Sequence, residues 1–274
     1  MSSRKRNKRK VYTFKSHIYK VLKQLHPTNG LSNDSVEQMN RVVEHFADKI
    51  ADEAAFLAKK EHKKTITSHE IQTAALLILP EGDGSYSFSF AKHAINEGKK
   101  AVDKYKEASS KKKVSRKVIR KVSRKAGRKK SRKVSRKASR KASMKKTTKS
   151  KKAGLVFPVA RFKTILKNRG FRIGEDAPVF LAGVMEYITA EILELAGNSA
   201  KDNRKTIITS RHLQLGSMGD EALNGLFGRI NLTGGGVVPH IHAALRPRPW
   251  QVRLLRKARQ ARARVKKANL KPKK

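Results

Sequence analysis

The residues of this chain that are best suited to chemistry are cations at regular spacing. From Val114 to Lys145 the sequence is a run of four-residue repeats of the type Val-Ser-Arg-Lys, so a basic pair recurs at almost every fourth position. The segment 111–152 holds 23 basic residues and no acidic one. Cations at this density bind polyanions by displacing their counterions. The repeat therefore indicates phosphate neutralisation, with a plain solvated linker as the alternative.

The rest of the charge is distributed just as unevenly. Lys and Arg number 66 against 21 Asp and Glu, for a net charge of +45. The acidic residues all lie within 34–107 and 175–221, whereas 1–10, 111–152 and 246–274 carry none. The sign of the charge points first to nucleic acid and second to an anionic membrane surface. We expect two folded islands, and we expect the basic segments to be disordered tails and a disordered linker.

Other kinds of site find little support in the sequence. The chain has no cysteine, which removes disulfides, thiol catalysis and cysteine-type zinc sites. His240 and His242 are spaced like a metal pair but lack a third ligand, so no metal site is predicted. No apolar run approaches the roughly 18 residues of a membrane span, and the basic stretch 1–10 does not begin a secretory signal. Without a nucleophile motif, an acid–base pair or a phosphate-cradling glycine loop, we expect neither an enzyme nor a cofactor.

A short motif, Ile-Thr-Ser-x-x-Ile/Leu-Gln, occurs twice, at 66–72 and at 208–214. A shift of 142 residues superposes the two copies and also the helical segments before them, with Val42 falling on Val184. The chain is therefore interpreted as one helical unit used twice. A unit that cannot bury its own apolar face is expected to pack on its copy.

Each island is predicted to fold as a short, a long and a short helix joined by loops. In the first island we expect helices at 12–25, 35–60 and 68–79, an irregular insertion at 82–90 and a last helix at 91–108. In the second we expect helices at 159–168, 178–200 and 210–217, then one or two turns at 220–227 and an extended glycine-rich tail. Thr67, followed by Glu70, predicts a capping box. The fold class is all-α, with basic loops brought together at the ends of the paired units.

The two islands resemble two different core histones. The first island resembles histone 2B over Ile18–Gln24, His26-Pro27, Thr65–Ser68, Glu70–Ala74 and parts of Ala91–Tyr105. The second resembles histone 2A over Ala153–Leu155, Phe157–Val159, Arg161, Glu191–Asn198, Asp202-Asn203, Arg211–Leu215 and parts of Gly235–Ile241. The order 2B then 2A in one chain is similar to the histone doublets of marseillevirus-type giant DNA viruses.

The resemblance implies two histone folds that pair within the chain as a handshake pseudo-heterodimer. The implied parts are a basic tail (1–11), a 2B-like fold (12–108), a basic linker (109–152), a 2A-like fold with a docking segment (153–245) and a basic extension (246–274). The extension is expected to lie on DNA or to be disordered.

The function implied by the resemblance is non-enzymatic DNA packaging in a nucleosome-like particle. Its partners would be double-stranded DNA and a histone 3–histone 4 pair, expected as another fused doublet, with two copies of this chain in each particle and no membrane. Such particles would lie in the host nucleus or a viral factory, and in the virion. The alternative is a histone-fold transcriptional regulator of specific DNA, although no base-reading element is visible.

Residues are carried over from the family one by one. The implied DNA-contacting residues are Lys63, Lys64, Thr65, Arg161, Arg172, Arg204, Lys205 and Thr206. The implied acidic patch is Glu97, Glu186, Glu191, Glu194, Asp220 and Glu221, with scattered helix-surface carboxylates as the alternative. The implied docking residues for the histone 3–histone 4 tetramer are Gly235, Gly236, Val237, Pro239 and Ile241.

Two positions depart from the family pattern at the DNA surface. Ile207 stands where the 2A family has an arginine that enters the minor groove, and Lys63 stands where the 2B family has a comparable arginine. Arginine suits a narrow minor groove better than lysine does, and isoleucine cannot replace it. We therefore expect a weaker grip at both points and easily unwrapped DNA ends.

Overall fold

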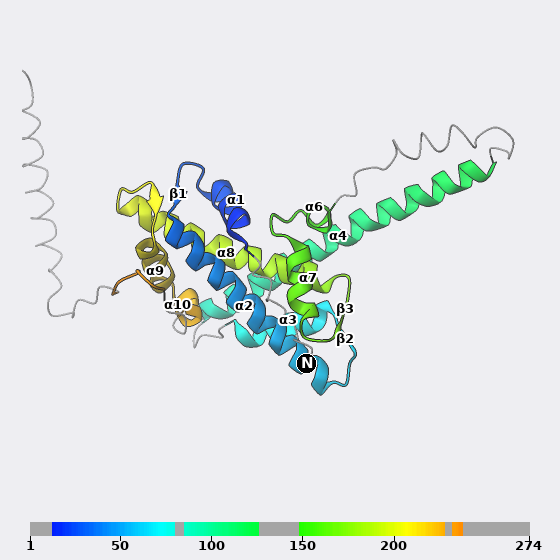
Figure 1. Cartoon of the computed structure of the whole chain (residues 1–274), viewed down its shortest axis with the longest axis horizontal. Helices are drawn as coiled ribbons and strands as arrows, with labels where there is room; N and C mark the ends of the chain where they lie inside the picture. Colours follow the sequence, from blue (N-terminus) through cyan, green and yellow to red (C-terminus); the bar gives the residue numbers. More distant parts are fainter. Residues whose placement is uncertain (1–12, 80–84, 126–147, 228–231, 238–274) are drawn as a thin grey trace, which may run out of the picture. The chain divides into compact units, whose positions relative to one another are not determined.

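The structure, a computed structural model, describes residues 13–79, 85–125, 148–227 and 232–237 (Figure 1). The predictions for the tails at 1–11 and 246–274, for the middle of the linker and for His240 and His242 lie outside these residues. The described part is nearly all helical, which confirms the predicted fold class.

The first unit is a helix–strand–helix–strand–helix motif followed by one more long helix. Its elements are α1 (Lys15–Leu25), β1 (Gly30–Leu31), α2 (Asn33–Lys60), β2 (Thr65–Ile66), α3 (Ser68–Ile78) and α4 (Ser85–Lys125). Local capping sets two of the starts. The Ser32 hydroxyl accepts from the Ser35 amide at 3.3 Å before α2, and the predicted capping box of α3 is present, with the Thr67 amide donating to Glu70 at 2.7 Å.

The second unit repeats this order after one short helix. Its elements are α6 (Lys149–Ala153), α7 (Val159–Lys167), β3 (Arg172–Ile173), α8 (Ala177–Asp202), β4 (Ile207–Ile208), α9 (Ser210–Gly219) and α10 (Glu221–Phe227). Each copy of the repeated motif covers the second strand and the start of the following short helix. In the second copy His212 takes the place of Glu70, and its Nδ1 accepts from the Thr209 amide at 3.1 Å.

The two units pair through their strands and their long helices. Strand β1 runs parallel to β4, and β2 runs parallel to β3, so the first loop of each unit meets the second loop of the other. Helix α8 packs against α1, α2, α3 and α4 of the first unit as well as against α7 and α9 of its own. The result is one continuous hydrophobic core shared by both units. This confirms the predicted handshake.

Helix α4 differs from the expectation at both ends. It starts at Ser85, so 85–90 is helical and not an irregular insertion, and it continues to Lys125, so the first three tetrads are helical and not disordered. The buried residues Ala94, Ile95 and Tyr105 fix the middle of this helix in the core. Once a helix is nucleated in this way, each added residue brings one more hydrogen bond at little further cost, even against like-charge repulsion.

The end of the linker is also ordered and returns to α4. Thr148 caps the short helix α6, which ends at Gly154 in the left-handed conformation with φ +72°. The ammonium groups of Lys149 and Lys152 lie 5.4 and 5.6 Å from the centre of the Tyr105 ring, within the range of a cation–π contact. Residues 148–152 therefore belong with the folded part, although they were expected to be linker.

Helices α4 and α8 cross at two glycines. A Cβ atom on Gly183 would lie 3.0 Å from the Cα atom of Gly98, and a Cβ atom on Gly98 would lie 3.0 Å from the Phe180 ring and 3.1 Å from Val184. Neither contact leaves room for a larger side chain, so these glycines set how closely the two units approach.

Gly98→Val is expected to lower the free energy of unfolding by about 1–3 kcal/mol, because the branched side chain overpacks the α4–α8 crossing. Urea unfolding followed by circular dichroism measures this loss. Gly219→Val is the matched control, since nothing lies within 4 Å of the Cβ atom added there. An unchanged midpoint for Gly98→Val would show that the crossing is not tightly packed.

Candidate nucleic-acid interface

One loop pair gathers four of the predicted DNA-contacting residues. Thr65 in β2 stands opposite Arg172 in β3, and the Arg172 amide donates to the Lys64 carbonyl at 3.1 Å. Lys64 and Arg172 are exposed, and Lys63 precedes them in the turn. The strand pairing therefore brings cations from both units to one end of the molecule.

The second loop pair gathers the other three predicted loop residues. The Gly30 amide in β1 donates to the Thr206 carbonyl at 2.9 Å. Arg204, Lys205 and Thr206 are all exposed, and Arg204 holds a left-handed backbone with φ 56° that turns the chain into β4. Because these cations precede α9, they lie beside a helix N-terminus, which also favours anions.

Ile207 sits in the middle of this second loop pair and faces outwards. Its side chain is 54% exposed, whereas the next residue, Ile208, is fully buried. Alternation along a strand explains the difference, since successive side chains point to opposite faces. The backbone thus presents at this point an apolar side chain where the resemblance leads one to expect an arginine.

Lys63 is neutralised within the chain. Its ammonium group lies 2.6 Å from Glu61 and 2.7 Å from Glu70. Burial of the Glu70 carboxyl raises its pKa, but hydrogen bonds from Lys63 and from Thr67 outweigh this and hold the pKa at about 2. The pKa of Lys63 is raised by the same two carboxylates. Because two carboxylates already pair with it, the Lys63 ammonium group is less available to a phosphate than the ammonium group of Lys64.

Arg161 lies apart from both loop pairs. It stands in the first turn of α7 with its guanidinium 5.6 Å from the centre of the Phe14 ring, and Phe14 packs on Phe157 and Phe162. The Nη1 atom of Arg161 is buried and has no hydrogen-bond partner within the described part of the chain. Arg161 is thus a separate cationic point beside α1.

Three of the six predicted acidic-patch residues, Glu97, Glu191 and Asp220, raise the pKa of Tyr187, and a fourth, Glu194, raises the pKa of Glu191. Burial, followed by the charge of Glu191 and smaller effects of Glu97 and Asp220, raises the pKa of Tyr187 to about 12. The pKa of Glu191 is raised by burial, then by Glu194 and Asp220. The Glu97 carboxylate is also paired with Lys100 at 2.6 Å.

The other two predicted acidic-patch residues are Glu186, whose carboxylate is already hydrogen-bonded within the chain, and Glu221. The Glu186 carboxylate accepts from the backbone amides of Val156 and Phe157, at 2.8 and 2.9 Å, and burial raises its pKa. Glu186 therefore anchors the chain before α7 and has less capacity for an outside ligand. The side chain of Glu221 lies outside the described residues.

The predicted docking segment is described only at its start. The Arg211 guanidinium donates to the Gly235 carbonyl at 2.9 Å, and the Gln38 amide donates to the Thr233 carbonyl. These contacts hold the segment against α2 and α9 up to Gly236. Val237 is exposed, and Pro239 and Ile241 lie outside the described residues.

Several functional candidates could not be found from the sequence. Phe56 on α2 and Leu77 on α3 are large apolar side chains that are 59% and 64% exposed. Arg169 joins the units by ion pairs to Asp48 at 2.9 Å and to Asp52 at 2.7 Å. In the sequence, the sign of these ion pairs is that Asp48 and Asp52 are four residues apart, a spacing that places both on one face of α2.

In the described ranges no group of three or more His, Asp or Glu is arranged to hold a metal ion. Over the same ranges, no helix combines the length and the apolar character that a membrane crossing requires.

Comparison with known proteins gives two family matches and one similar relative. A model for the core histone domain, which covers histones 2A, 2B, 3 and 4, matches residues 2–77 and 133–217. A model for the C-terminus of histone 2A matches residues 221–249. A histone 2A (type 2A.2) of Lodderomyces elongisporus is 54% identical over 103 residues, which are 37% of this chain and 80% of that protein.

Glu70→Gln is expected to make the free energy of unfolding less dependent on pH. The folded pKa of about 2 lies below the ordinary value of 4.5, so the ionised Glu70 stabilises the fold above pH 4.5. That contribution is lost as the pH falls from about 4.5 towards 2. Urea midpoints measured across this range should show wild type and variant converging at low pH. A constant difference between them would mean that the Glu70 charge does not stabilise the fold.

Ile207→Arg is expected to tighten binding to random-sequence duplex DNA and to steepen its dependence on salt. One added phosphate contact changes the slope of log K against log salt by about 0.9. Anisotropy titrations at several salt concentrations measure this slope. Asn96→Arg, on the exposed surface of α4, adds the same charge away from the loop pairs. Equal gains from the two variants would show that position 207 does not face DNA.

Proposed function

The chain belongs to the core histone family, and we propose that it packages double-stranded DNA in a nucleosome-like particle. Membership of this family supports a structural role in chromatin. The proposal goes further and treats the chain as a fused histone 2B–histone 2A dimer. It would bind DNA without sequence preference, through phosphate and minor-groove contacts.

The two parallel loop pairs are the observation that carries this proposal. Each pair joins a loop from one unit to a loop from the other, and each presents exposed cations to solvent. Lys64 and Arg172 mark one end of the handshake, and Arg204 and Lys205 mark the other. A rigid body with a cationic point at each end suits a duplex that bends around it, because backbone contacts fix the path of DNA without reading its bases. The basic linker would add further phosphate contacts.

The described surface also supports a protein partner. Phe56 and Leu77 are exposed apolar residues on α2 and α3, two helices that pack on each other. Large apolar side chains left in water commonly mark protein interfaces. We assign this face, together with Gly235, Gly236, Val237, Pro239 and Ile241, to a histone 3–histone 4 partner, itself a fused chain. Two copies of the present chain would complete the particle.

The carboxylates around Tyr187 are proposed as a second docking site. Glu97, Glu191, Glu194 and Asp220 raise the local negative potential in a chain whose net charge is +45. Such a surface suits basic peptides or the tails of neighbouring particles. Glu186 would contribute less, since two backbone amides already occupy its carboxylate.

The fused arrangement supports a more specific biological setting. Two histone units in one chain, in the order 2B then 2A, are similar to the doublets of marseillevirus-type giant DNA viruses. We therefore propose that the chain compacts a viral genome in the host nucleus or a viral factory, and that it is carried in the virion.

Reconstitution with a histone 3–histone 4 partner on random-sequence DNA, followed by nuclease digestion, is expected to leave a discrete protected fragment. Leu77→Glu should abolish the fragment while leaving the circular dichroism spectrum unchanged, because it places a charge on the proposed partner face. Asn96→Glu, an exposed change on α4, adds the same single negative charge away from this face and should leave the fragment intact. A smear of digestion products from the wild-type mixture would contradict the proposal, and protection of one preferred sequence only would favour a regulator.

A further inference from the structure

The two loop pairs are equivalent by the internal repeat, but they carry different side chains. The shift of 142 residues that superposes the two units places Gly30 on Arg172 and Thr65 on Ile207. In the structure these residues are strand partners, Thr65 with Arg172 and Gly30 with Ile207. At these positions one pair offers an arginine and a threonine, which can both bond a phosphate, whereas the glycine and the isoleucine of the other pair have no side-chain donor.

Ile207 is an apolar side chain that protrudes from a cationic surface. Its strand partner Gly30 has no side chain to cover it, and 54% of the isoleucine is exposed. The three residues before it, Arg204, Lys205 and Thr206, are exposed as well. A ligand that the two cations attract therefore meets the isoleucine at the same place.

The backbone around Ile207 is fixed on both sides. The Gly30 amide donates to the Thr206 carbonyl at 2.9 Å, and the Ser32 amide donates to the Ile208 carbonyl at 3.0 Å. Ile208 is fully buried and occupies the inward position, so Ile207 cannot turn into the core while the strand pair persists. Branching at Cβ also restricts its rotamers. A side chain that is already rigid loses little entropy when it inserts into a partner.

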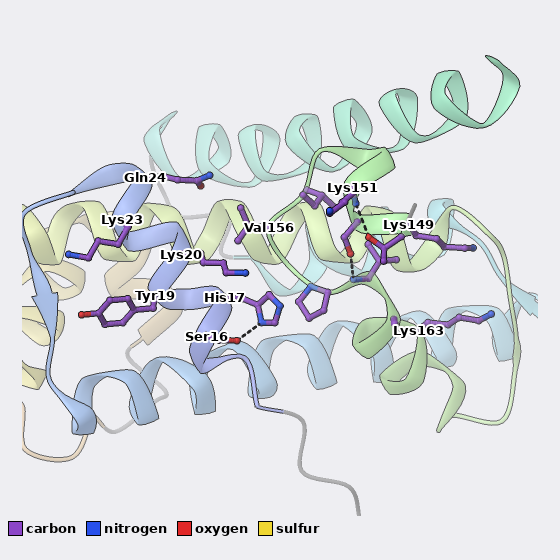
Figure 2. Close-up of a pocket in the computed structure, with 16 residues that line it drawn as sticks. Ser16, His17, Tyr19, Lys20, Lys23, Gln24, Lys149, Lys151, Val156 and Lys163 are labelled. Atoms are coloured by element: carbon purple, nitrogen blue, oxygen red, sulfur yellow. Dashed lines mark hydrogen bonds between the residues drawn. The ribbon is translucent and has the colours of Figure 1, made fainter. Parts of the chain in front are cut away.

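Positive groups belong to both strands of this loop pair. Arg204 and Lys205 precede β4, and Lys23 of α1 reaches over the loop that precedes β1 (Figure 2). The Lys23 ammonium group donates there to the carbonyls of Pro27 and Asn29, each at 2.9 Å. Helices α2 and α9 begin directly after β1 and β4, so their N-termini add positive potential. Cations on both strands suit the two sugar–phosphate backbones that border one groove of a duplex.

Duplex DNA offers an isoleucine few apolar partners. The methyl groups of thymine lie in the major groove, which is wide enough for a whole helix or a two-stranded ribbon. The faces of the bases are apolar too, but they are stacked on one another. Architectural DNA-binding proteins reach them from the minor groove, by inserting an apolar side chain between two base pairs and kinking the duplex. A single rigid isoleucine flanked by cations has the form of such a wedge.

We infer that Ile207 enters the minor groove and wedges between two base pairs, so that this loop pair kinks the DNA, whereas the Thr65–Arg172 pair holds it by polar contacts alone. The inference rests on the proposed function, because it needs DNA at the loop pairs. Unstacking is easiest at flexible pyrimidine–purine steps such as TA, and easier still at a mismatch. The chain is therefore expected to favour deformable DNA without reading its bases.

The first test compares the affinities of the full chain for two short duplexes of equal length, one fully paired and one with a single central T·T mismatch. Anisotropy competition should show the wild type binding the mismatched duplex about fivefold tighter or more, because the mismatch removes much of the unstacking cost. Ile207→Thr keeps the branched shape and the charge and should remove this preference, and Ile207→Leu should retain it. Equal affinities of the wild type for the two duplexes, or an unchanged preference in Ile207→Thr, would overturn the inference.

The internal repeat also provides a gain-of-function variant. Thr65→Ile combined with Arg172→Gly copies the Gly30–Ile207 pair onto the other loop pair, and it should increase the preference for mismatched DNA while weakening overall binding through the lost arginine. Circular dichroism and urea unfolding check that the variant is folded. A folded variant without the added preference would contradict the wedge as the cause.

Permanganate, which oxidises unstacked thymines, detects the wedge directly. The full chain should promote oxidation at a TA step and leave thymines in a stiff A-tract of the same duplex unreactive, and Ile207→Thr should abolish the oxidation. Replacing thymine by deoxyuridine should leave the mismatch preference unchanged, and its loss would assign Ile207 to a thymine methyl group in the major groove and overturn the inference. DNA binding and nuclease protection without TA oxidation would remove the wedge and leave the packaging proposal standing, whereas a failure to bind DNA would contradict both.

Discussion

The structure depends on one constraint, which is that helix α8 is apolar on every side along its first nine residues. Its residues from Ala177 to Met185 are all buried, with no polar face among them. A helix that is apolar all round needs neighbours on every side. Helices α7 and α9 of its own unit cover only part of it, and α1, α2, α3 and α4 of the first unit cover the rest. Pairing of the two units is therefore a condition of folding and not a later association step.

Pairing also decides where the charges stand. Each strand pair contains one strand from each unit, so the cations of Lys64 and Arg172, far apart in the chain, meet only in the paired state. The ion pairs from Arg169 to Asp48 and Asp52 join the two units in the same arrangement, outside the hydrophobic core. The apolar interface therefore supplies the free energy of pairing, and the geometry that it imposes gathers the loop cations at the two ends of the paired units.

Sequence reasoning worked where the physics is local or periodic. The long helices, the repeated order of helices in the two units and the capping box of Thr67 and Glu70 follow from spacing within a few residues, and the structure confirms them. Contacts between residues that are distant in the sequence cannot be predicted in this way. Examples are the ion pair of Lys63 with Glu70, the hydrogen bond from the Phe157 amide to Glu186, and the ion pair of Arg169 with Asp48 in the other unit. The extension of α4 to Lys125 was missed because an isolated basic repeat disfavours a helix, whereas one continuing from a packed helix does not need to nucleate. Ile207 was recognised as a departure, but its outward orientation comes from the strand pairing.

The covalent joining of the two units changes the reaction order of their pairing. Two separate histone chains meet in a second-order step, so their folded fraction falls on dilution. Here each unit carries its partner at the effective concentration of a tether, which α6 shortens by returning to Tyr105 on α4. Folding is then first order, and the equilibrium between paired and unpaired units does not depend on how much protein is present. The two units are also always made in equal amounts, and neither can exchange into a pair with another histone without leaving its own partner tethered beside it.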